Sequence, residues 1–219
     1  MPAHVETLVV ATGNRGKLEE LRALLEGLPL IVRSVSEVLA EPPRVVEDGA
    51  TFAENAIKKA QVVAAATLTM TLADDSGLEV DALEGRPGVR SARFAHDRAT
   101  DAENNAALLA ALEPLDPPSA PGFSARFRCV LALVDPYTHG GAPQTVEGTC
   151  EGHVARAPRG TGGFGYDPLF VVAGGDRTMA ELSMDEKSAT SHRGKAFAAL
   201  RGLIEATLRA RAEQARRLG

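Results

Sequence analysis

Apolar positions in the first part of the chain alternate between short continuous runs and helical spacings. Residues 8–11 form a short, β-branched run, which is typical of a buried strand. Leucines then recur at helical spacing from Leu18 to Leu25, and Gly27 ends the predicted helix. Residues 70–73 form a second buried run, which predicts another strand.

Capping signals predict the starts of two further helices. Thr51 with Glu54, and Thr100 with Glu103, have the spacing of a capping box, and each pair precedes apolar residues at helical spacing. A long amphipathic pattern over residues 193–217 predicts a helix near the end of the chain.

The second half of the chain adds extended segments. Residues 125–134 and 145–154 are predicted strands, and Gly140-Gly141 between them indicates a hairpin connection. A last strand is predicted over residues 169–172. Because strands and helices alternate early and a hairpin follows, the pattern predicts an α/β fold with a mixed sheet.

Length, composition and charge narrow the class of protein. The 219 residues suffice for one large domain or two small lobes with a sizeable core. No stretch approaches the roughly 18 apolar residues of a membrane span, and we see no secretory signal. A net charge of −5 argues against binding DNA or RNA through a basic surface, but not against one basic pocket for a small anion. Four of the thirteen prolines lie within residues 113–122, so we predict a flexible surface loop over about 113–123.

The polar loop after the first strand is a candidate phosphate site. It consists of Thr12, Gly13, Asn14, Arg15, Gly16 and Lys17. The free N–H groups and the dipole of a helix N-terminus attract phosphate, and Lys17 adds a mobile positive charge. Ala11 and Leu18 stand where a Walker A loop needs Gly and Ser/Thr, so the loop is not of that type. An ordinary helix start, with Asn14 as the N-cap, is the alternative interpretation.

Carboxylates follow the second buried run, in Asp74-Asp75-Ser76-Gly77 at the predicted strand end. Adjacent carboxylates repel each other unless a cation or a proton lies between them, and Mg²⁺ prefers one or two carboxylates plus substrate phosphate oxygens. Glu47 could add a third carboxylate. A solvated polar turn is the alternative in both places.

Two further segments complete the candidate chemistry. Residues 161–168 combine glycines with Phe164 and Tyr166, which could stack on a purine or simply fill a glycine-rich hairpin. Lys187, His192 and Arg193 form a cationic cluster just before the last predicted helix, unless they are only its solvated start. Together with the two earlier sites, these segments favour a nucleotide with Mg²⁺.

Seven blocks in the same order resemble one family over about residues 7–204. They are Ala11-Thr-Gly-Asn-x-x-Lys17, Thr51-Phe-x-Glu-Asn55, Ala73-Asp-Asp-Ser-Gly77, Pro87-Gly-Val-x-Ser-Ala-Arg93, Gly162-Gly-Phe-Gly-Tyr-Asp-Pro168, Ala180-Glu-Leu182 and Ser191-His-Arg193. These blocks closely resemble the inosine/xanthosine triphosphate pyrophosphatase (Ham1-like) family. The resemblance implies Mg²⁺-dependent hydrolysis of ITP, dITP and XTP to the monophosphate and pyrophosphate, by a cytoplasmic homodimer. It also implies one domain over residues 1–219, with an elongated, twisted mixed sheet flanked by helices and two lobes around a central cleft.

The resemblance assigns a role to each matching residue. Residues 12–17 would bind the triphosphate. Asp75 would be a metal ligand and would accept the proton of the attacking water, and Glu47 would be the second metal ligand. Asp74 would support the metal, and Lys59 would face the phosphates.

The remaining roles concern the base and its surroundings, and they fall on Ser76, Phe164, Gly165, Tyr166, Asp167, Lys187, His192 and Arg193. The resemblance makes Ser76 a substrate contact and implies that residues 164–167 hold the base, with Phe164 stacking on it. It also implies that Lys187, His192 and Arg193 complete the pocket for the base and the phosphates.

Three other interpretations stay open. A related Maf-type nucleotide pyrophosphatase would share the chemistry but act on other bases, and a nucleotide sensor would bind without hydrolysis. An RNA-binding module has its support in residues 201–219, which carry five Arg against two Glu. A solvated amphipathic face explains that helix equally simply.

Overall fold

The computed structural model describes residues 5–115 and 122–218. Residue contacts divide the chain into two compact units. Unit 1 comprises Met1–Asp75, Val130–Glu147 and Ala196–Gly219, and unit 2 comprises Ser76–Cys129 and Gly148–Lys195. Most of the predicted flexible loop over about 113–123 falls on residues 116–121, which lie outside the described residues.

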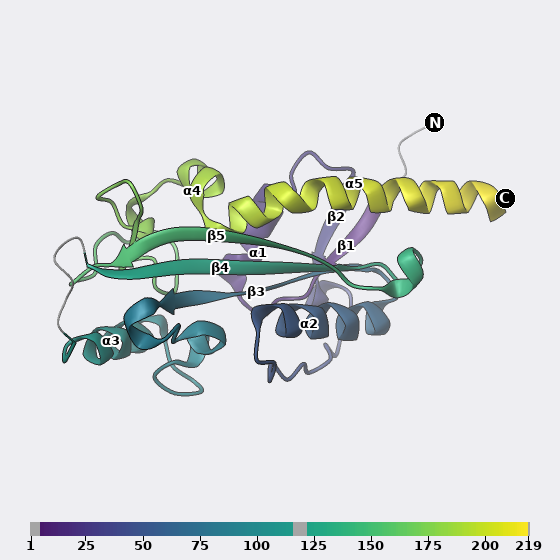
Figure 1. The fold of residues 1–219 in the computed structure, drawn as a ribbon. Coiled ribbons are helices and arrows are strands. Elements are labelled where there is room, and N and C mark those ends of the chain that lie inside the picture. The colour runs from purple at the N-terminus through teal and green to yellow at the C-terminus, as the bar shows by residue number, and fades with distance from the viewer. Residues whose placement is uncertain (1–4, 116–121, 219) are drawn as a thin grey trace. The chain divides into compact units, whose positions relative to one another are not determined.

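Six strands form one sheet in the order β2-β1-β3-β4-β5-β6. They are β1 (Glu6–Val10), β2 (Leu30–Ser34), β3 (Met70–Val80), β4 (Phe123–Val134), β5 (Gln144–Val154) and β6 (Phe170–Val172). β1 pairs in parallel with both β2 and β3, whereas β5 pairs antiparallel with β6. The predicted α/β fold with a mixed sheet is therefore confirmed (Figure 1).

Five α-helices accompany the sheet in the described residues: α1 (Arg15–Leu24), α2 (Phe52–Thr67), α3 (Asp101–Leu112), α4 (Met184–Thr190) and α5 (His192–Leu218). None of the helices in the part of the chain that the structure describes is long and apolar enough to span a membrane.

The helix starts show which capping signals formed. Asn14 caps α1, since its side-chain oxygen accepts a hydrogen bond from the N–H of Lys17 at 3.1 Å. The capping box at the start of α3 is complete. Only half of the box at α2 forms, because the carboxylate of Glu54 accepts from the N–H of Ala50 instead of that of Thr51.

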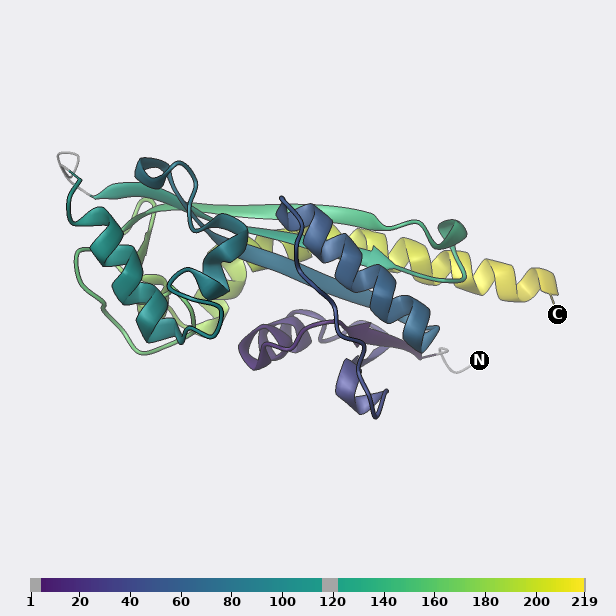
Figure 2. The same cartoon turned by 90° about the horizontal axis from the view of Figure 1, so that it is seen from below.

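The core of unit 1 combines the first strands with the apolar face of α2. Leu8, Leu21 and Leu72 are fully buried there, as is Ala60 on α2. Within this unit, α2 lies on one face of the strands and the C-terminal part of α5 lies on the other (Figures 1 and 2). Apolar positions recur at helical spacing in α2 and α5, because only the face of each helix that packs on the strands has to be apolar.

The core of unit 2 is a cluster of apolar side chains from α3, from strands β3 to β6 and from the glycine-rich segment. It includes Leu78, Leu108, Phe127, Tyr166 and Phe170. The ring of Phe127 packs on that of Phe170, with 4.6 Å between the centroids. The predicted aromatic segment is thus partly a core element.

Three features differ from the predictions. β3 does not end at residue 73 but continues to Val80, since Asp74 and Asp75 are buried in the strand and the apolar positions resume at Leu78. β2 was not predicted, although it begins with the short apolar run Leu30-Ile31-Val32. The cluster at 187–193 does not precede a helix: Lys187 lies inside α4, and α5 begins at residue 192.

Candidate active site

The predicted site residues fall into two groups, one in each unit. Residues 12–17, Glu47, Asp74 and Asp75 belong to unit 1, and the remaining predicted residues, beginning with Ser76, belong to unit 2. Asp75 and Ser76 are consecutive in β3, so one peptide bond joins the two groups.

The phosphate loop of unit 1 joins β1 to α1. The N–H of Ala11 donates to the carbonyl of Leu72 on β3 at 2.8 Å, which fixes the start of the loop. Thr12 Oγ1 accepts from the N–H of Asn14 at 3.2 Å. Arg15 is exposed and pairs with Glu19 one turn further along α1, so its guanidinium is directed along the helix surface.

Two lysines approach the carboxylates of unit 1. Lys17 Nζ lies 3.0 Å from Asp74 Oδ2, and this aspartate is completely buried. Lys59 Nζ lies 2.8 Å from Glu47 Oε2 and 3.5 Å from Asp75 Oδ1. The carboxylates of Glu47 and Asp75 therefore converge on one ammonium group, although 28 positions separate them in the sequence.

Asn55 is a buried polar residue of this group that the sequence interpretation left without a role. Its Nδ2 donates to Asp75 Oδ2 at 3.1 Å, and its Oδ1 accepts from the N–H of Gly49 at 2.8 Å. A Cβ at Gly49 would lie 2.8 Å from that oxygen, so only glycine lets the loop approach. Asn55 thus links the segment that carries Glu47 to Asp75. The signal was a polar residue within the block that begins at Thr51.

Burial and charge act in opposite directions on these groups. Burial raises the pKa of Asp75, and the attraction of Lys59 and Lys17 only partly offsets it. Burial also lowers the pKa of Lys59, but the carboxylates of Asp74, Asp75 and Glu47 outweigh this, and the net shift is upward. A carboxyl with a raised pKa, held next to cations, suits a group that takes up a proton.

The carboxylate oxygens of unit 1 fit a divalent cation that is also bound by the substrate. Among the described residues, no three His, Cys, Asp or Glu side chains are grouped closely enough to hold a metal by themselves. Glu47 and Asp75, however, offer carboxylate oxygens around a position that a cationic nitrogen approaches. Two carboxylates completed by substrate phosphates and water are a normal Mg²⁺ environment, so the residues fit that ion.

In unit 2, Phe164 and Arg193 form a flat, positively charged surface. Arg193 Cζ lies 5.4 Å from the centroid of the half-buried Phe164 ring, within cation–π range. Arg193 Nη2 also donates to Ser76 Oγ at 3.2 Å. The predicted contacts Ser76, Phe164 and Arg193 are therefore brought together.

Lys187 and Asp167 form a buried ion pair with 2.8 Å between Nζ and Oδ2. The same oxygen accepts from the N–H of Phe164 at 3.3 Å. A Cβ at Gly163, where φ is +82°, would collide with both side chains, which explains the glycine. Through Asp167, the pair fixes the backbone of the glycine-rich segment at Phe164. The positive charge of Lys187 is balanced by the carboxylate of Asp167.

Tyr166 lies in the core and does not present an open ring face. Its side chain is 3% exposed, and its hydroxyl donates to the carbonyl of Ser91 at 2.9 Å. Burial raises the pKa of this phenol. For Tyr166, the structure therefore favours the alternative of an aromatic core residue over a stacking platform.

His192 begins α5 and stacks on Phe127. The ring centroids are 4.8 Å apart and the planes are inclined by 19°. Ser191 caps the helix, since its Oγ accepts from the N–H of Gly194 at 3.1 Å. The imidazole orientation is thus set by an aromatic residue of β4 that the sequence interpretation did not single out.

Comparisons with known proteins identify the family of the chain. The model of the Ham1 family matches residues 8–203. The chain belongs to the Ham1 family. It is 51% identical to the dITP/XTP pyrophosphatase of Geobacter sulfurreducens over 194 residues, covering 89% of this chain and 94% of that protein. It is 46% identical to the dITP/XTP pyrophosphatase of Bacillus subtilis over 198 residues, covering 90% of this chain and 96% of that protein.

Solved structures of Ham1 proteins have the same fold. A HAM1 protein from Coxiella burnetii has a TM-score of 0.80 and 43% identity, with 91% of this chain and 98% of that chain covered. The nucleoside-triphosphatase / dITP/XTP pyrophosphatase of Mycobacterium abscessus has a TM-score of 0.69 and 45% identity, with 89% and 98% covered. The family resemblance inferred from the motifs is confirmed.

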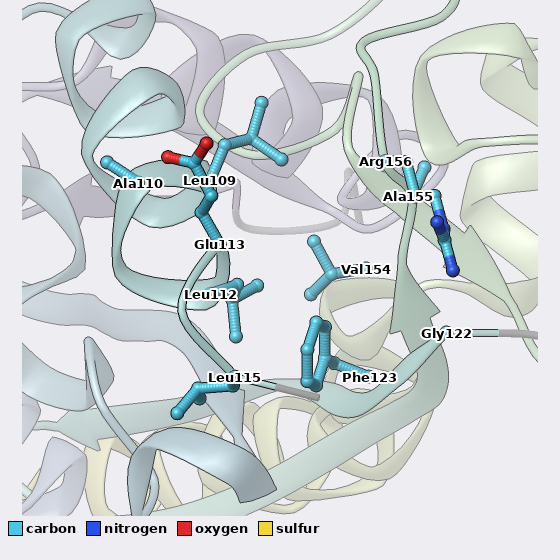
Figure 3. Close-up of a pocket in the computed structure, with 10 residues that line it drawn as sticks. All are labelled: Leu109, Ala110, Leu112, Glu113, Leu115, Gly122, Phe123, Val154, Ala155 and Arg156. Atoms are coloured by element: carbon cyan, nitrogen blue, oxygen red, sulfur yellow. The ribbon is translucent and has the colours of Figure 1, made fainter. Parts of the chain in front are cut away.

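A separate pocket of this Ham1 protein lies in unit 2 and has a volume of about 550 Å³ (Figure 3). Its walls come from α3, the start of β4 and the end of β5, and its lining residues are mostly apolar. Figure 3 shows Leu112, Val154 and Phe123 around it, with Glu113 and Arg156 as the charged members. No predicted site residue lines this pocket, so it is not the candidate active site.

Proposed function

We propose that this chain is a nucleotide pyrophosphatase that hydrolyses aberrant purine nucleoside triphosphates, such as ITP, dITP and XTP. The products would be the nucleoside monophosphate and pyrophosphate, and the biological result would be a cleaner nucleotide pool. Relatives named dITP/XTP pyrophosphatase support the proposal. The structural observation that carries it is the convergence of Glu47 and Asp75 on Lys59 in the unit that also holds residues 12–17.

Unit 1 would carry the chemical step. Mg²⁺, held by Glu47 and Asp75, would neutralise phosphate charge and bind a water. Asp75 accepts a proton from the attacking water as the water oxygen bonds to the α-phosphorus. The bond from the α-phosphorus to the oxygen that bridges to the β-phosphorus then breaks, and pyrophosphate leaves. The side chains of Lys17 and Lys59 would hold the triphosphate, together with the N–H groups of residues 12–17 other than those of Asn14 and Lys17, which are bound within the loop.

Unit 2 would select the base. Phe164 stacks on the purine, and donors near His192 and Arg193 bind the 6-keto oxygen. A 6-amino group would leave these donors unpaired, which is a costly mismatch. GTP shares the 6-keto group, so its rejection must depend on the 2-amino position. Ser76, Gly165, Tyr166, Asp167 and Lys187 complete this part of the site by contact or by holding the loop.

A nucleotide panel with Mg²⁺, assayed for pyrophosphate and for orthophosphate, tests the proposal. We expect pyrophosphate from ITP, dITP and XTP, with much slower turnover of ATP. Equal turnover of ATP and ITP would refute the base assignment. Binding without any pyrophosphate release would identify a sensor, and a preference for other bases would indicate a Maf-type enzyme. Repeating the assay with EDTA and then with Mn²⁺ or Ca²⁺ tests the choice of metal.

We also propose that the enzyme is a cytoplasmic homodimer, as the family resemblance implies. Light scattering coupled to size-exclusion chromatography tests the dimer, and a mass close to the 23.0 kDa of one chain would contradict it.

A further inference from the structure

The loop that we assign to the base has little regular structure of its own. Residues 163–167, called the base loop below, consist of bends and turns between β5 and β6. Its backbone N–H and C=O groups cannot pair along a strand ladder, so other groups must satisfy them. The source of those hydrogen bonds therefore decides how firmly Phe164 is held.

Both polar groups of Gly165 are bound by α3. The N–H of Gly165 donates to Asp101 Oδ2 at 2.7 Å, and its carbonyl accepts from Asn105 Nδ2 at 2.9 Å. Asn105 Nδ2 also donates to the carbonyl of Asp101 at 2.8 Å. Since this nitrogen faces two carbonyl oxygens, the reversed amide would place an acceptor against both. The side chain is therefore fixed in one orientation.

The first turns of α3 are anchored well enough to act as a rigid clamp. Asp101 and Asn105 are four positions apart, so they lie on the same side of the helix. Between them, Asn104 is buried and binds the segment after β3: its Nδ2 donates to the carbonyl of Ala92 at 3.2 Å, and its Oδ1 accepts from the N–H of Ala95 at 3.0 Å.

The clamp determines the position of the neighbouring aromatic ring. Gly165 has φ +61°, a conformation that glycine adopts without strain. The peptide group that follows Phe164 contains the bound N–H of Gly165, so a movement of Gly165 turns the Phe164 side chain as well. On its other side, the N–H of Phe164 is tied to Asp167, and its ring lies below Arg193.

We propose that Asp101 and Asn105 are positioning residues for base recognition, which fix Gly165 so that Phe164 stacks on the purine of the substrate. This inference rests on the proposed function and adds two residues that contact the base loop but not the substrate. Asp101 and Asn105 influence binding through the position of Phe164, so they affect binding of the purine base and not binding of the phosphates.

Product inhibition separates binding of the base from binding of the phosphates. The proteins to compare are the wild type, Asp101→Ala and Asn105→Ala, and the measurements are the inhibition constants of inosine monophosphate and of pyrophosphate during ITP hydrolysis. We expect the constant for inosine monophosphate to rise about 5- to 10-fold in each variant, as for the loss of one or two hydrogen bonds. The constant for pyrophosphate and kcat should stay within about twofold, because neither depends on the base loop.

Two matched variants serve as controls. Asp101→Asn keeps an acceptor oxygen for Gly165 and should retain wild-type inhibition by inosine monophosphate. Glu103→Ala removes the two hydrogen bonds that the Glu103 carboxylate accepts from the N–H and the hydroxyl of Thr100, but it touches no group of the base loop. It should lower the melting temperature while leaving both inhibition constants unchanged. Alanine is a good helix former, so both clamp variants should keep α3 folded.

The outcomes distinguish this inference from the proposed function. If the wild type releases no pyrophosphate from ITP, the proposed function fails. If it does release pyrophosphate and both clamp variants bind inosine monophosphate as tightly as the wild type, the clamp is overturned. An equal weakening in Glu103→Ala would also overturn it, since general loosening of α3 would then explain the effect.

Discussion

The two units differ in the contacts that hold most of their site residues, although Asn55 in unit 1 and the Lys187–Asp167 pair in unit 2 are exceptions. In unit 1, charged side chains pair with one another: Lys17 with Asp74, and Lys59 with Glu47 and Asp75. Coulomb attraction between such groups changes gradually with distance, so a small shift of one side chain alters the site little. The important quantity in unit 1 is the balance of charge around Asp75.

In unit 2, side chains bind the backbone of a loop. Asp101 and Asn105 bind Gly165, and the hydroxyl of Tyr166 binds the carbonyl of Ser91. Hydrogen bonds weaken steeply with angle, so these contacts define an orientation instead of a charge. We therefore expect substitutions in unit 1 to act on the chemical step and substitutions in unit 2 to act on binding of the base.

The largest effect is expected from Asp75→Asn. The amide keeps the size of the side chain but cannot accept the proton of water, so kcat should fall by about 10³-fold. The inhibition constant of inosine monophosphate should stay within about twofold, because the proposed function assigns the base to unit 2. Asp48→Asn, an exposed change in the same unit, is the control. Retained turnover of ITP by Asp75→Asn would contradict the assignment of the chemical step to unit 1.

Lys59→Met should cost about 10²-fold in kcat, a loss typical for removing a charge that stabilises a phosphoryl transition state. Burial raises the pKa of Asp75 and Lys59 lowers it, so the variant should raise it further. Asp75 would then stay protonated to higher pH, and the acid limb of the rate profile should move upward in pH. Lys58→Met, next in the chain and paired with the exposed Asp48, should leave the profile unchanged.

Phe164→Leu tests the other side of the comparison. Loss of base stacking should raise the inhibition constant of inosine monophosphate about 5- to 30-fold. Pyrophosphate inhibition and the pH profile should not change, since no group of unit 1 is altered. If kcat fell as far as in Lys59→Met, orientation of the base would be part of the chemical step, and the comparison would have to be redrawn.

Local features of the fold were predictable because they depend on neighbours in the sequence. The cap at Asn14 and the capping box of Thr100 with Glu103 formed as predicted, and apolar periodicity located most strands and helices. The predicted end of β3 was wrong because it depends on residues that are distant in the sequence. Asp74 and Asp75 resemble a polar turn until lysines from α1 and α2 are brought beside them.

The chemical groups of the site were predictable from motifs, but their supports were not. Asn55 belongs to the block that begins at Thr51, but its hydrogen bonds to Gly49 and Asp75 exist only in the folded chain. The contact of Asp101 with Gly165 spans 64 positions, so no sequence spacing indicates it. Asp101 and Asn105 lie in none of the seven blocks, because ordinary hydrogen bonding to a backbone group needs no special residue pattern.

The smallest effect on activity is expected at a third charged group of unit 1. Arg211 on α5 makes two hydrogen bonds to Asp135, at 2.8 and 2.7 Å, and a third to Glu6. No predicted site residue belongs to this group. Asp135→Asn should lower the free energy of unfolding by about 2 kcal/mol at pH 7, the scale of a lost charge-assisted hydrogen bond, and leave kcat unchanged.

The pH dependence of that loss separates a structural ion pair from a catalytic one. Burial raises the pKa of Asp135, but hydrogen bonds from Arg211, the N–H of Tyr137 and the hydroxyl of Thr138 outweigh it, so the net shift is downward. A carboxyl with a lowered pKa stabilises the fold above its ordinary pKa of 3.8 and loses that effect as pH falls through the lowered value. The wild type should therefore have a higher free energy of unfolding in urea than Asp135→Asn at pH 7 and 5, and this difference should shrink as pH falls below the ordinary pKa of 3.8. The exposed Asp176→Asn is the control, and it should unfold in urea at pH 7 at the same concentration as the wild type. A fall in kcat for Asp135→Asn at pH 7 would mean that charge pairing throughout unit 1, and not only around Asp75, controls the chemical step.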